Sequence, residues 1–519
     1  MEESPSAYIP MDRRQAIARG EGLPNRTHGA ALFADISGFT PLTEALLRAY
    51  GPGRGAEELT RQLNLIYDAL VTEVHRYGGS VLAFSGDAIT CWLDRDSGLQ
   101  ATACGLAMQR AMGQFSAITT PAGDVIPLAM KVAVAIGPVR RFRLGDPQIQ
   151  YIDALAGDTL NKMAEAEHQA EKGEVVVGPD VIARIGDQLD IVAWREVDPQ
   201  HRFGVVGGIK REAEAAAPPA GWPPLTAEAL VEEQIRPWVL PPIYERLQTG
   251  QGQFLAELRP AVVMFLYFSG IDYDNDEAAG DKLDAYIRWV QTVLAHYDGY
   301  IFQLTIGDKG SYLYTAYGAP TAHEDDAIRA VSTALALQAL PAELNFIEEV
   351  RIGISQGQMY TGAYGGNKRR TYGLLGDDVN LAARLMQAAQ PGQTLVSEAA
   401  QRNTNDLFTW EQLPPFKVKG KTNSIVAFHP TGQKSRATMR LHEVHYALPM
   451  VGRTQELTCL EEKLSQALAG RGQIVAVTGE AGMGKSRLVA ELIHSATNQN
   501  MIGYGGEGQS YGTNISYLV

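Results

Sequence analysis

The chain has 519 residues, of which 45% are hydrophobic and 20% charged, and its formal net charge is −14. This composition is typical of a globular protein with about three domains. The acidic excess argues against nucleic acid or an anionic membrane as the main partner. Because no apolar run reaches the ~18 residues of a membrane-spanning helix and no signal-peptide pattern begins the chain, we expect a cytoplasmic protein.

The first third of the chain predicts an irregular N-terminal arm (1–29) and then an α+β domain (30–206). The arm is polar and interrupted by proline and glycine. Apolar spacing and turn residues predict a βαββαβ-like unit in the domain. Its expected elements are a strand at 31–35, a helix at 57–75, a hairpin at 80–92, a helix at 99–115, a strand at 129–136 and a helix around Asn161.

The same order of elements returns about 220 residues later, which indicates a domain duplication. Between the copies, residues 207–258 are rich in alanine and proline, as in a linker with one short helix. The second domain should span 259–432. Its clearest elements are a strand at 261–267, a helix at 283–297 and a hairpin at 300–317.

A pair of acidic residues is complete in the first domain only. Asp35 ends a strand in Phe33-Ala34-Asp35-Ile36-Ser37-Gly38, and Asp87 lies at the tip of a hairpin. The matching positions of the second domain hold Tyr267 and Asp308. Each aspartate alone could be an ordinary turn residue. Together, at repeated positions, they predict a site.

An Asn–Arg pair is complete in the second domain only. Gly376-Asp377-Asp378-Val379-Asn380-Leu381-Ala382-Ala383-Arg384 places Asn380 and Arg384 on one helix face, four residues apart. The first domain has Asn161 and Glu165 there. The carboxylates and the Asn–Arg pair therefore predict one composite site between the two domains.

The two carboxylates suit a pair of divalent metal ions. Ions about 3.5–4 Å apart can activate an attacking oxygen and stabilise a leaving phosphate oxygen. The Ile36 carbonyl could complete the shell of one ion. The backbone amides that we expect to face phosphates are those of Gly38, Phe39 and Thr40.

These segments resemble the class III nucleotidyl cyclases, and the tandem followed by a phosphate loop looks like the soluble adenylyl cyclase branch. The resemblance implies two ferredoxin-like domains paired about a pseudo-twofold axis within the chain. It also implies a reaction, in which the ribose 3′-hydroxyl of ATP attacks the α-phosphate to give cyclic AMP and pyrophosphate. Two Mg²⁺ or Mn²⁺ ions are the implied cofactors.

Matched position by position, the resemblance assigns the catalytic residues. Asp35 and Asp87 match the metal-binding aspartates, and Asn380 matches the asparagine that orients the ribose. Arg384 matches the arginine that stabilises charge on the α-phosphate, and Lys419 the lysine that binds the outer phosphates. A solvated run of surface charge is the simpler explanation for the segment around Lys419.

The base-reading positions depart from the adenylyl pattern of a lysine with an aspartate or threonine. Gly373 stands at the second position, and we expect it to leave room in the pocket. Counting from the end of the preceding helix puts Gln303 at the lysine position, whereas counting from Gly307-Asp308 gives Leu304; we prefer Gln303. Because a glutamine amide both donates and accepts, the choice between ATP and GTP stays open.

The opposite combination of half-sites should be inactive. Tyr267 replaces a metal ligand, and Glu165, in place of the arginine, would repel a triphosphate. This second site could hold a small regulator. However, Ala83 and Ala164 stand near the lysine and arginine positions that serve bicarbonate in the soluble branch, which argues against bicarbonate activation.

A third module begins near residue 433 and contains a phosphate loop. Gly479-Glu480-Ala481-Gly482-Met483-Gly484-Lys485-Ser486 follows an apolar strand expected at 474–477 and precedes a helix. Backbone amides and Lys485 would hold phosphates, and Ser486 a magnesium ion. Only 33 residues follow Ser486, without a strand ending in an acidic pair, so we expect an incomplete NTPase domain of the AAA/STAND kind.

The sequence therefore favours a tandem cyclase that converts ATP, fused in cis to a signalling NTPase. Two alternatives remain. The first is a guanylyl cyclase that uses GTP. The second is a catalytically weak pair of domains that senses nucleotides and regulates the NTPase.

Overall fold

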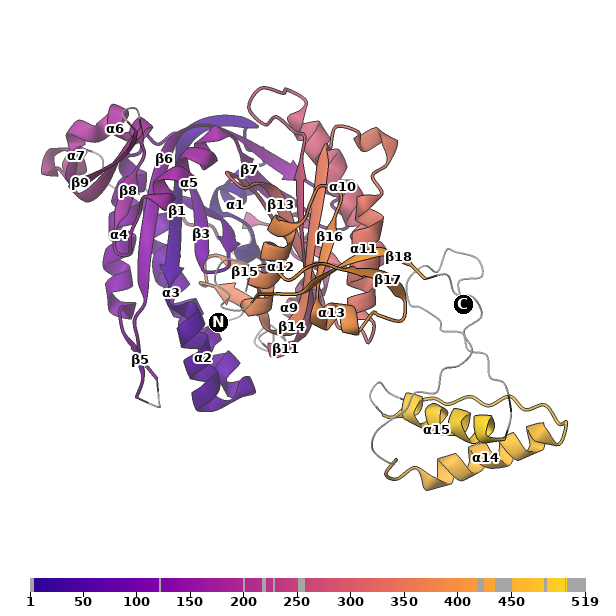
Figure 1. The fold of residues 1–519 in the computed structure, drawn as a ribbon. Coiled ribbons are helices and arrows are strands. Elements are labelled where there is room, and N and C mark those ends of the chain that lie inside the picture. Colours follow the sequence, from indigo (N-terminus) through magenta and orange to yellow (C-terminus); the bar gives the residue numbers. More distant parts are fainter. Residues whose placement is uncertain are drawn as a thin grey trace. The chain divides into compact units, whose positions relative to one another are not determined.

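The computed structural model describes residues 4–120, 123–198, 201–216, 221–226, 229–250, 257–417, 424–434, 450–479, 483–499 and 501. The chain forms two compact units, Met1–Gln433 and Lys434–Val519, each of which is described by itself (Figure 1). No helix in the described ranges is long and apolar enough to cross a membrane.

The first unit contains two large sheets with the same strand order, which confirms the mixed α+β class and the duplication. The first sheet runs β2-β3-β1-β6-β8-β10-β9, with β7 paired to β6, and the second runs β12-β13-β11-β14-β16-β18-β17, with β15 paired to β14. The strands of the first sheet are β1 (Arg26–Ser37), β2 (Ser80–Ser85), β3 (Ala88–Asp94), β6 (Ala129–Leu144), β7 (Ile152–Ala156), β8 (Val175–Val177), β9 (Leu189–Asp198) and β10 (His201–Ile209). Those of the second are β11 (Glu257–Ser269), β12 (Tyr300–Gly307), β13 (Gly310–Tyr317), β14 (Glu349–Gly365), β15 (Arg370–Leu375), β16 (Thr394–Ser397), β17 (Phe408–Gln412) and β18 (Ala427–Gln433).

Corresponding helices accompany the two sheets. The helices of the first repeat are α2 (Phe39–Tyr50), α3 (Pro52–Arg76), α4 (Leu99–Met112), α5 (Asp158–His168) and α6 (Pro179–Ile185), and those of the second are α10 (Ala279–His296), α11 (Asp326–Gln338), α12 (Asp377–Ala388) and α13 (Glu398–Arg402). A two-stranded ribbon of β4 (Ile118–Thr119) and β5 (Val125–Ile126) projects from the first repeat.

The long helix α3 shows why the apolar spacing predicted the fold correctly. Five of its apolar residues recur every three or four positions and pack into the core of the first repeat. They are at most 2% exposed: Leu59, Leu63, Ile66, Leu70 and Val74. The predicted hairpins β2–β3 and β12–β13 are also confirmed.

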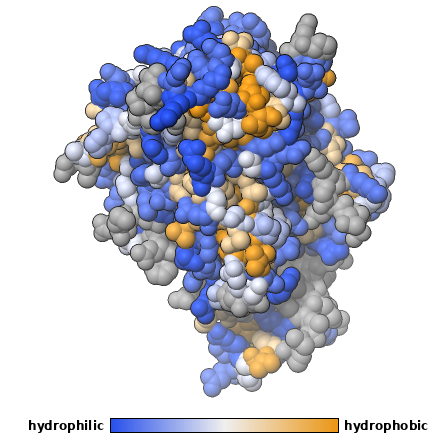
Figure 2. Space-filling view, turned by 90° about the vertical axis from the view of Figure 1, so that its left-hand side faces the viewer, coloured by the Kyte–Doolittle hydropathy of each residue, from blue (hydrophilic) through white to orange (hydrophobic). Residues whose placement is uncertain are grey.

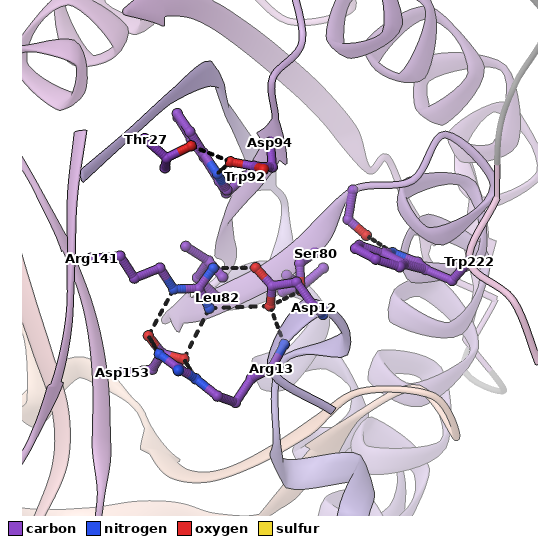
Figure 3. A network of polar contacts seen from close by, with 12 residues as sticks. Asp12, Arg13, Thr27, Ser80, Leu82, Trp92, Asp94, Arg141, Asp153 and Trp222 are labelled. Atoms are coloured by element: carbon purple, nitrogen blue, oxygen red, sulfur yellow. Dashed lines mark hydrogen bonds and ion pairs between the residues drawn. The ribbon is translucent and has the colours of Figure 1, made fainter. Parts of the chain in front are cut away.

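The expectation of an irregular N-terminal arm is wrong, because Met11–Ala18 forms the helix α1. Its charged side chains are buried against the first sheet (Figure 3). Arg141 of β6 forms ion pairs with Asp12 and, at 2.8 Å, with Asp153 of β7, and Arg13 lies 3.0 Å from Asp153. Ser80 donates a 2.9 Å hydrogen bond to Asp12. These charged residues are buried because they are paired with one another. A search for apolar periodicity does not detect a helix that is buried through charged residues.

The linker has more structure than the single short helix predicted for it. It contains α7 (Arg211–Ala216), α8 (Glu232–Ile235) and α9 (Pro241–Gln248). Val239 and Ile243 are buried with residues of the second sheet. A few apolar residues thus anchor a segment whose proline content indicated only a connection.

The two repeats hold each other through their β6–β7 and β14–β15 connections. The backbone amide of Asn367, after β14, donates a 2.8 Å hydrogen bond to Asp68 of α3 in the first repeat. In the other direction, the backbone amide of Gly145, after β6, donates a 2.7 Å hydrogen bond to Asp284 of α10. Corresponding connections therefore contact corresponding helices.

The second unit contains α14 (Thr454–Leu468) and α15 (Lys485–Asn498). The strand predicted at 474–477 is wrong: these residues have no regular secondary structure, and Ile474 is fully exposed. The described part of this unit has no other strand with which it could pair, and a single strand cannot satisfy its backbone groups.

Polar side chains dominate the face of the molecule in Figure 2, and apolar residues gather in separate patches.

Large apolar side chains are exposed on the edge strand β9, namely Val192, Trp194 and Val197. The guanidinium of Arg202 covers the Trp194 ring at 3.7 Å. A charged group over an aromatic face is one way of shielding an exposed strand.

The buried ion-pair network gives a stability prediction. Arg141→Met should lower the free energy of unfolding by about 3–5 kcal/mol, because it leaves Asp12 and Asp153 buried without their main cation. Denaturant unfolding followed by circular dichroism measures this change. Arg26→Ala breaks the exposed Arg26–Glu277 pair and should cost less than ~1 kcal/mol. Equal effects of the two variants would contradict the role given to the network.

Candidate active site

A cavity of about 790 Å³ lies between the two repeats and is lined by residues of both. The first repeat contributes α2, α3 and the tip of the β2–β3 hairpin, and the second contributes its sheet and α12. Sequence-predicted residues that line it are Phe39, Thr40, Asp87, Gln303 and Asn380. The structure therefore brings together groups that lie about 300 residues apart.

The N-terminus of α2 forms one wall. Gly38 precedes the helix with φ of 111°, and a Cβ atom there would lie 2.5 Å from the Pro127 carbonyl oxygen, so only glycine fits. Phe39 and Thr40 begin the helix, where backbone amides have no partner within the helix. Such amides and the helix dipole favour a phosphate group.

The two predicted metal ligands lie near each other at the edge of the first sheet. Asp35 is the partner of Ala88 in the β1–β3 register, one residue from Asp87, and the Asp87 carbonyl accepts a hydrogen bond from the Ile36 amide. Asp87 lines the large cavity and an adjoining one of about 360 Å³, whereas Asp35 lines only the second. Ser85 and Lys309 also line both. The two cavities thus meet at the carboxylates.

The carboxylates carry an excess of negative charge. Desolvation, followed by repulsion from Asp35, raises the pKa of Asp87 to about 6. Asp87 is exposed at the tip of its hairpin, yet its carboxyl group faces both cavities, so solvent screens only part of this effect. Desolvation also raises the pKa of Asp35, although nearby Lys131 opposes the shift.

Lys131 is a neighbour of the carboxylates that sequence reasoning missed. It is opposite Asp35 in the β1–β6 register, and its ammonium lies 3.6 Å from the Asp35 carboxylate and forms a closer ion pair with Glu167 of α5. It lies between the buried residues Met130 and Val132, and a single lysine in an apolar strand gave no signal of a site. The second repeat has Arg351 opposite Tyr267, 4.0 Å above the tyrosine ring.

The donor set fits divalent metal ions that bind together with a phosphate ligand. Two carboxylates and the Ile36 carbonyl are hard oxygen donors, as Mg²⁺ and Mn²⁺ prefer. Within the described ranges, no cluster of three or more His, Cys, Asp or Glu side chains offers a complete metal site. Substrate oxygens would have to supply the remaining ligands.

The Asn–Arg pair is placed unequally. Asn380 on α12 lines the large cavity together with Val379 and Ala383, but Arg384, one turn later and half-buried, is outside its lining. Lys419 lies outside the described residues. The structure thus joins Asn380 to Asp87 in one cavity and leaves Arg384 beside it.

Of the two positions predicted to contact the base, Gln303 has a side chain in the cavity and Gly373 does not. Gln303 lines the cavity, and its amide nitrogen donates hydrogen bonds to Ser85 at 2.7 Å and Thr305 at 2.8 Å. The expectation that Gly373 leaves room is wrong. A Cβ atom there would lie 2.9 Å from the Tyr314 hydroxyl oxygen and 3.2 Å from the Tyr364 ring, so these tyrosines fill the space.

The adjoining cavity contains the opposite half-sites. Asp308 and the β12–β13 turn face α5 across it, and Ala83 and Ala164 are in its lining. Glu165, predicted to replace the arginine there, is exposed and outside the lining, whereas Glu167 lines the cavity. The glutamate that faces this cavity is therefore a different one from that which the sequence indicated.

Part of the phosphate loop is described in the second unit. Gly484, with φ of 83°, precedes α15, which begins with Lys485 and Ser486. The aliphatic part of the Lys485 side chain lies 3.8 Å from the position of a Cβ atom on Gly479. The lysine thus folds back over the start of the loop.

The raised pKa of Asp87 gives a pH prediction for metal binding. A carboxylate must lose its proton to bind a metal ion, so Mn²⁺ affinity should rise from pH 5 to 7 and then level off. With a pKa of about 6, the loss at pH 5 should be about tenfold. Isothermal calorimetry of Mn²⁺ in the presence of a saturating non-cyclisable ATP analogue, which supplies the remaining oxygen ligands, measures this profile. Asp87→Asn should remove it and Asp308→Asn should keep it; a flat wild-type profile would contradict the assignment.

Comparisons with known proteins give a match for each of two parts of the chain. Residues 278–430 match the family described as the adenylate and guanylate cyclase catalytic domain, and residues 449–519 match the AAA ATPase domain. A solved structure with a similar fold is a class III adenylyl cyclase-like ATP-binding protein from Pseudomonas aeruginosa. It is 14% identical, with a TM-score of 0.50, and the match covers 73% of this chain and 85% of that one.

Two of the curated relatives are adenylate cyclases by name. Adenylate cyclase type 10 of Oryctolagus cuniculus is 24% identical over 95% of this chain and 32% of its own length, and the Homo sapiens protein is 24% identical over 91% and 31%. The chain thus spans about a third of the length of these relatives. Residues 278–430 thus match the adenylate and guanylate cyclase catalytic domain, in a chain that resembles adenylate cyclase type 10 along nearly all of its length.

Proposed function

We propose that this protein is a nucleotidyl cyclase that converts ATP to cyclic AMP and pyrophosphate at one composite site between its repeats. The observation that carries the proposal is the cavity of about 790 Å³. Asp87 and the N-terminus of α2 line it from the first repeat, and Gln303 and Asn380 from the second. Neither repeat alone has this set of groups.

The proposal requires the repeats, 30–206 and 259–432, to pair about a pseudo-twofold axis. The reciprocal hydrogen bonds from Asn367 to Asp68 and from Gly145 to Asp284 support this arrangement, because each repeat uses the same elements to hold the other. In this proposal, the segments 1–29 and 207–258 pack against the paired repeats. Residues 433–519 begin an NTPase module in the same chain.

The first repeat would position the triphosphate. Amides of Gly38, Phe39 and Thr40 at the start of α2 would donate hydrogen bonds to phosphate oxygens. Asp35, Asp87 and the Ile36 carbonyl would hold two Mg²⁺ or Mn²⁺ ions, which when bound neutralise phosphate charge and favour loss of the 3′-hydroxyl proton. The phosphate chain is thereby fixed for an in-line displacement.

The second repeat would position the ribose and the α-phosphate. Asn380 is proposed to hydrogen-bond the ribose, so that the 3′-oxygen faces the α-phosphorus. A bond then forms between these atoms as the bond to the pyrophosphate oxygen breaks. Arg384 is proposed to swing its flexible side chain toward the negative charge that develops there, and Lys419 to bind the outer phosphates.

Two other functions keep specific support. Gly373 and Gln303, in place of the usual base-reading pair, support GTP as the alternative substrate. The position of Arg384 outside the cavity lining supports a catalytically weak module that senses nucleotides and regulates the NTPase. We propose a cytoplasmic protein, and its acidic composition supports the proposal that it has no nucleic acid or membrane partners.

Paired variants of the two hairpin tips test the function. Cyclic nucleotide formation is measured with Mn²⁺, from ATP and separately from GTP, and the wild type should form cyclic AMP as its main product. Asp87→Ala should reduce turnover by at least ~10²-fold through loss of a metal ligand. Asp308→Ala, at the corresponding tip, should retain most of it.

Three outcomes would go against the proposal. Equal losses in both variants would exclude a single site. Cyclic GMP as the main product would select the guanylyl alternative. Nucleotide binding without either product would select the sensing module.

A further inference from the structure

Tyr314 occupies the place from which the missing base-reading side chain would act. It lies on β13 and lines the large cavity, and it is only 9% exposed. Its hydroxyl oxygen lies 2.9 Å from where the Cβ atom of a larger residue at Gly373 would be. The glycine and the tyrosine are therefore complementary: a side chain at position 373 and the Tyr314 hydroxyl exclude each other.

The Tyr314 ring is held in a fixed orientation. It stacks on Phe265 of β11, with ring centroids 5.2 Å apart and planes 20° apart. It also stacks on Phe302 of β12, at 5.6 Å and 12°. A ring between two aromatic neighbours loses little further freedom when a ligand binds its hydroxyl, so its hydrogen bond can discriminate between ligands.

The hydrogen-bond donors and acceptors that Tyr314 and Gln303 offer to a ligand can also be assigned. Burial raises the pKa of Tyr314 well above its ordinary value, so the hydroxyl is protonated, and a hydrogen bond from the Leu374 backbone to its oxygen partly opposes that shift. That bond uses the hydroxyl oxygen as an acceptor, so the hydroxyl hydrogen can be donated to a ligand. Gln303 donates its amide hydrogens to Ser85 and Thr305, which leaves the side-chain carbonyl oxygen as an acceptor.

We propose that Tyr314 and Gln303 together read the base and select adenine. The Tyr314 O–H donates to adenine N1, and the Gln303 carbonyl accepts from the 6-amino group. Guanine presents an N1–H donor and an O6 acceptor at these positions, so both contacts are mismatched. This inference rests on the proposed function and adds its substrate specificity.

Tyr364 provides a matched control. Its hydroxyl oxygen also lies 3.2 Å from the position of a Cβ atom on Gly373, and its side chain is 2% exposed. However, it packs against Tyr67 and is not in the lining of the cavity. Tyr314→Phe and Tyr364→Phe each remove one hydroxyl from the same neighbourhood, and only the first should affect base selection.

The test measures the affinities of ATP, GTP and 1-deaza-ATP by calorimetry with Ca²⁺ present. All proteins carry Lys485→Ala, so that the phosphate loop does not contribute. In this background, ATP should bind at least ~10-fold more tightly than GTP, and 1-deaza-ATP, which lacks the N1 acceptor, ~5–10-fold more weakly than ATP. Tyr314→Phe should weaken ATP binding by the same factor and leave GTP within about twofold.

Measuring both nucleotides on both proteins gives a double-mutant-type cycle. Because the cycle compares ATP with 1-deaza-ATP on the same protein, a general loss of protein stability in the variant cancels out. In Tyr314→Phe, ATP and 1-deaza-ATP should bind about equally, whereas Tyr364→Phe should keep the ~5–10-fold difference. An unchanged ATP-to-GTP ratio in Tyr314→Phe would overturn the inference while the cyclase proposal stood. If the parent protein bound neither ATP nor GTP, the proposed function would fail with it.

Discussion

The cavity depends on one buried cation that joins the repeats. Arg369, in the β14–β15 connection of the second repeat, donates hydrogen bonds to the carbonyl oxygens of Val81 at 2.9 Å and Leu82 at 3.1 Å in β2, and to that of Tyr8 at 2.9 Å. Burial lowers the pKa of Arg369 to about 9, although the negative charges of Asp153 and Asp12 oppose the shift, so the guanidinium stays charged at neutral pH. The carbonyl dipoles also stabilise that charge, and they do so only when β2, the N-terminal segment and the second repeat are in register. Ser85, which lines the cavity, is the last residue of β2, and Asp87 follows it in the hairpin turn.

The duplication explains how one chain can contain complementary half-sites. Both sheets have the same strand order, and each repeat holds a helix of the other through the same connection. With the frame fixed in this way, each half-site could lose its own groups independently. The first repeat kept Asp35 and Asp87, and the second kept Asn380. The adjoining cavity has Asp308 and Glu167 in its lining, and Glu167 is paired there with Lys131, whereas Tyr267 lines the large cavity.

The local sequence pattern predicted those helices and hairpins whose formation depends on apolar spacing and turn residues. The apolar spacing of α3 and the glycine turns of both hairpins predicted their elements to within a few residues. The helix α1 was missed because its buried residues are charged, and the strand at 474–477 was wrong because a strand needs partners that spacing does not supply. In the site, the positions of Asp87 and Asn380 followed from the motif. The role of Tyr314 beside Gly373 did not, because it joins two strands through a contact that only the three-dimensional packing creates.

Both repeats are proposed to hold a single nucleotide at once. A structure of the protein with a non-cyclisable ATP analogue and Mn²⁺ tests this most directly. We predict that the phosphates lie at the N-terminus of α2 beside Asp35 and Asp87, and that the ribose lies next to Asn380. An analogue bound only by groups of one repeat, or in the adjoining cavity against α5, would contradict it.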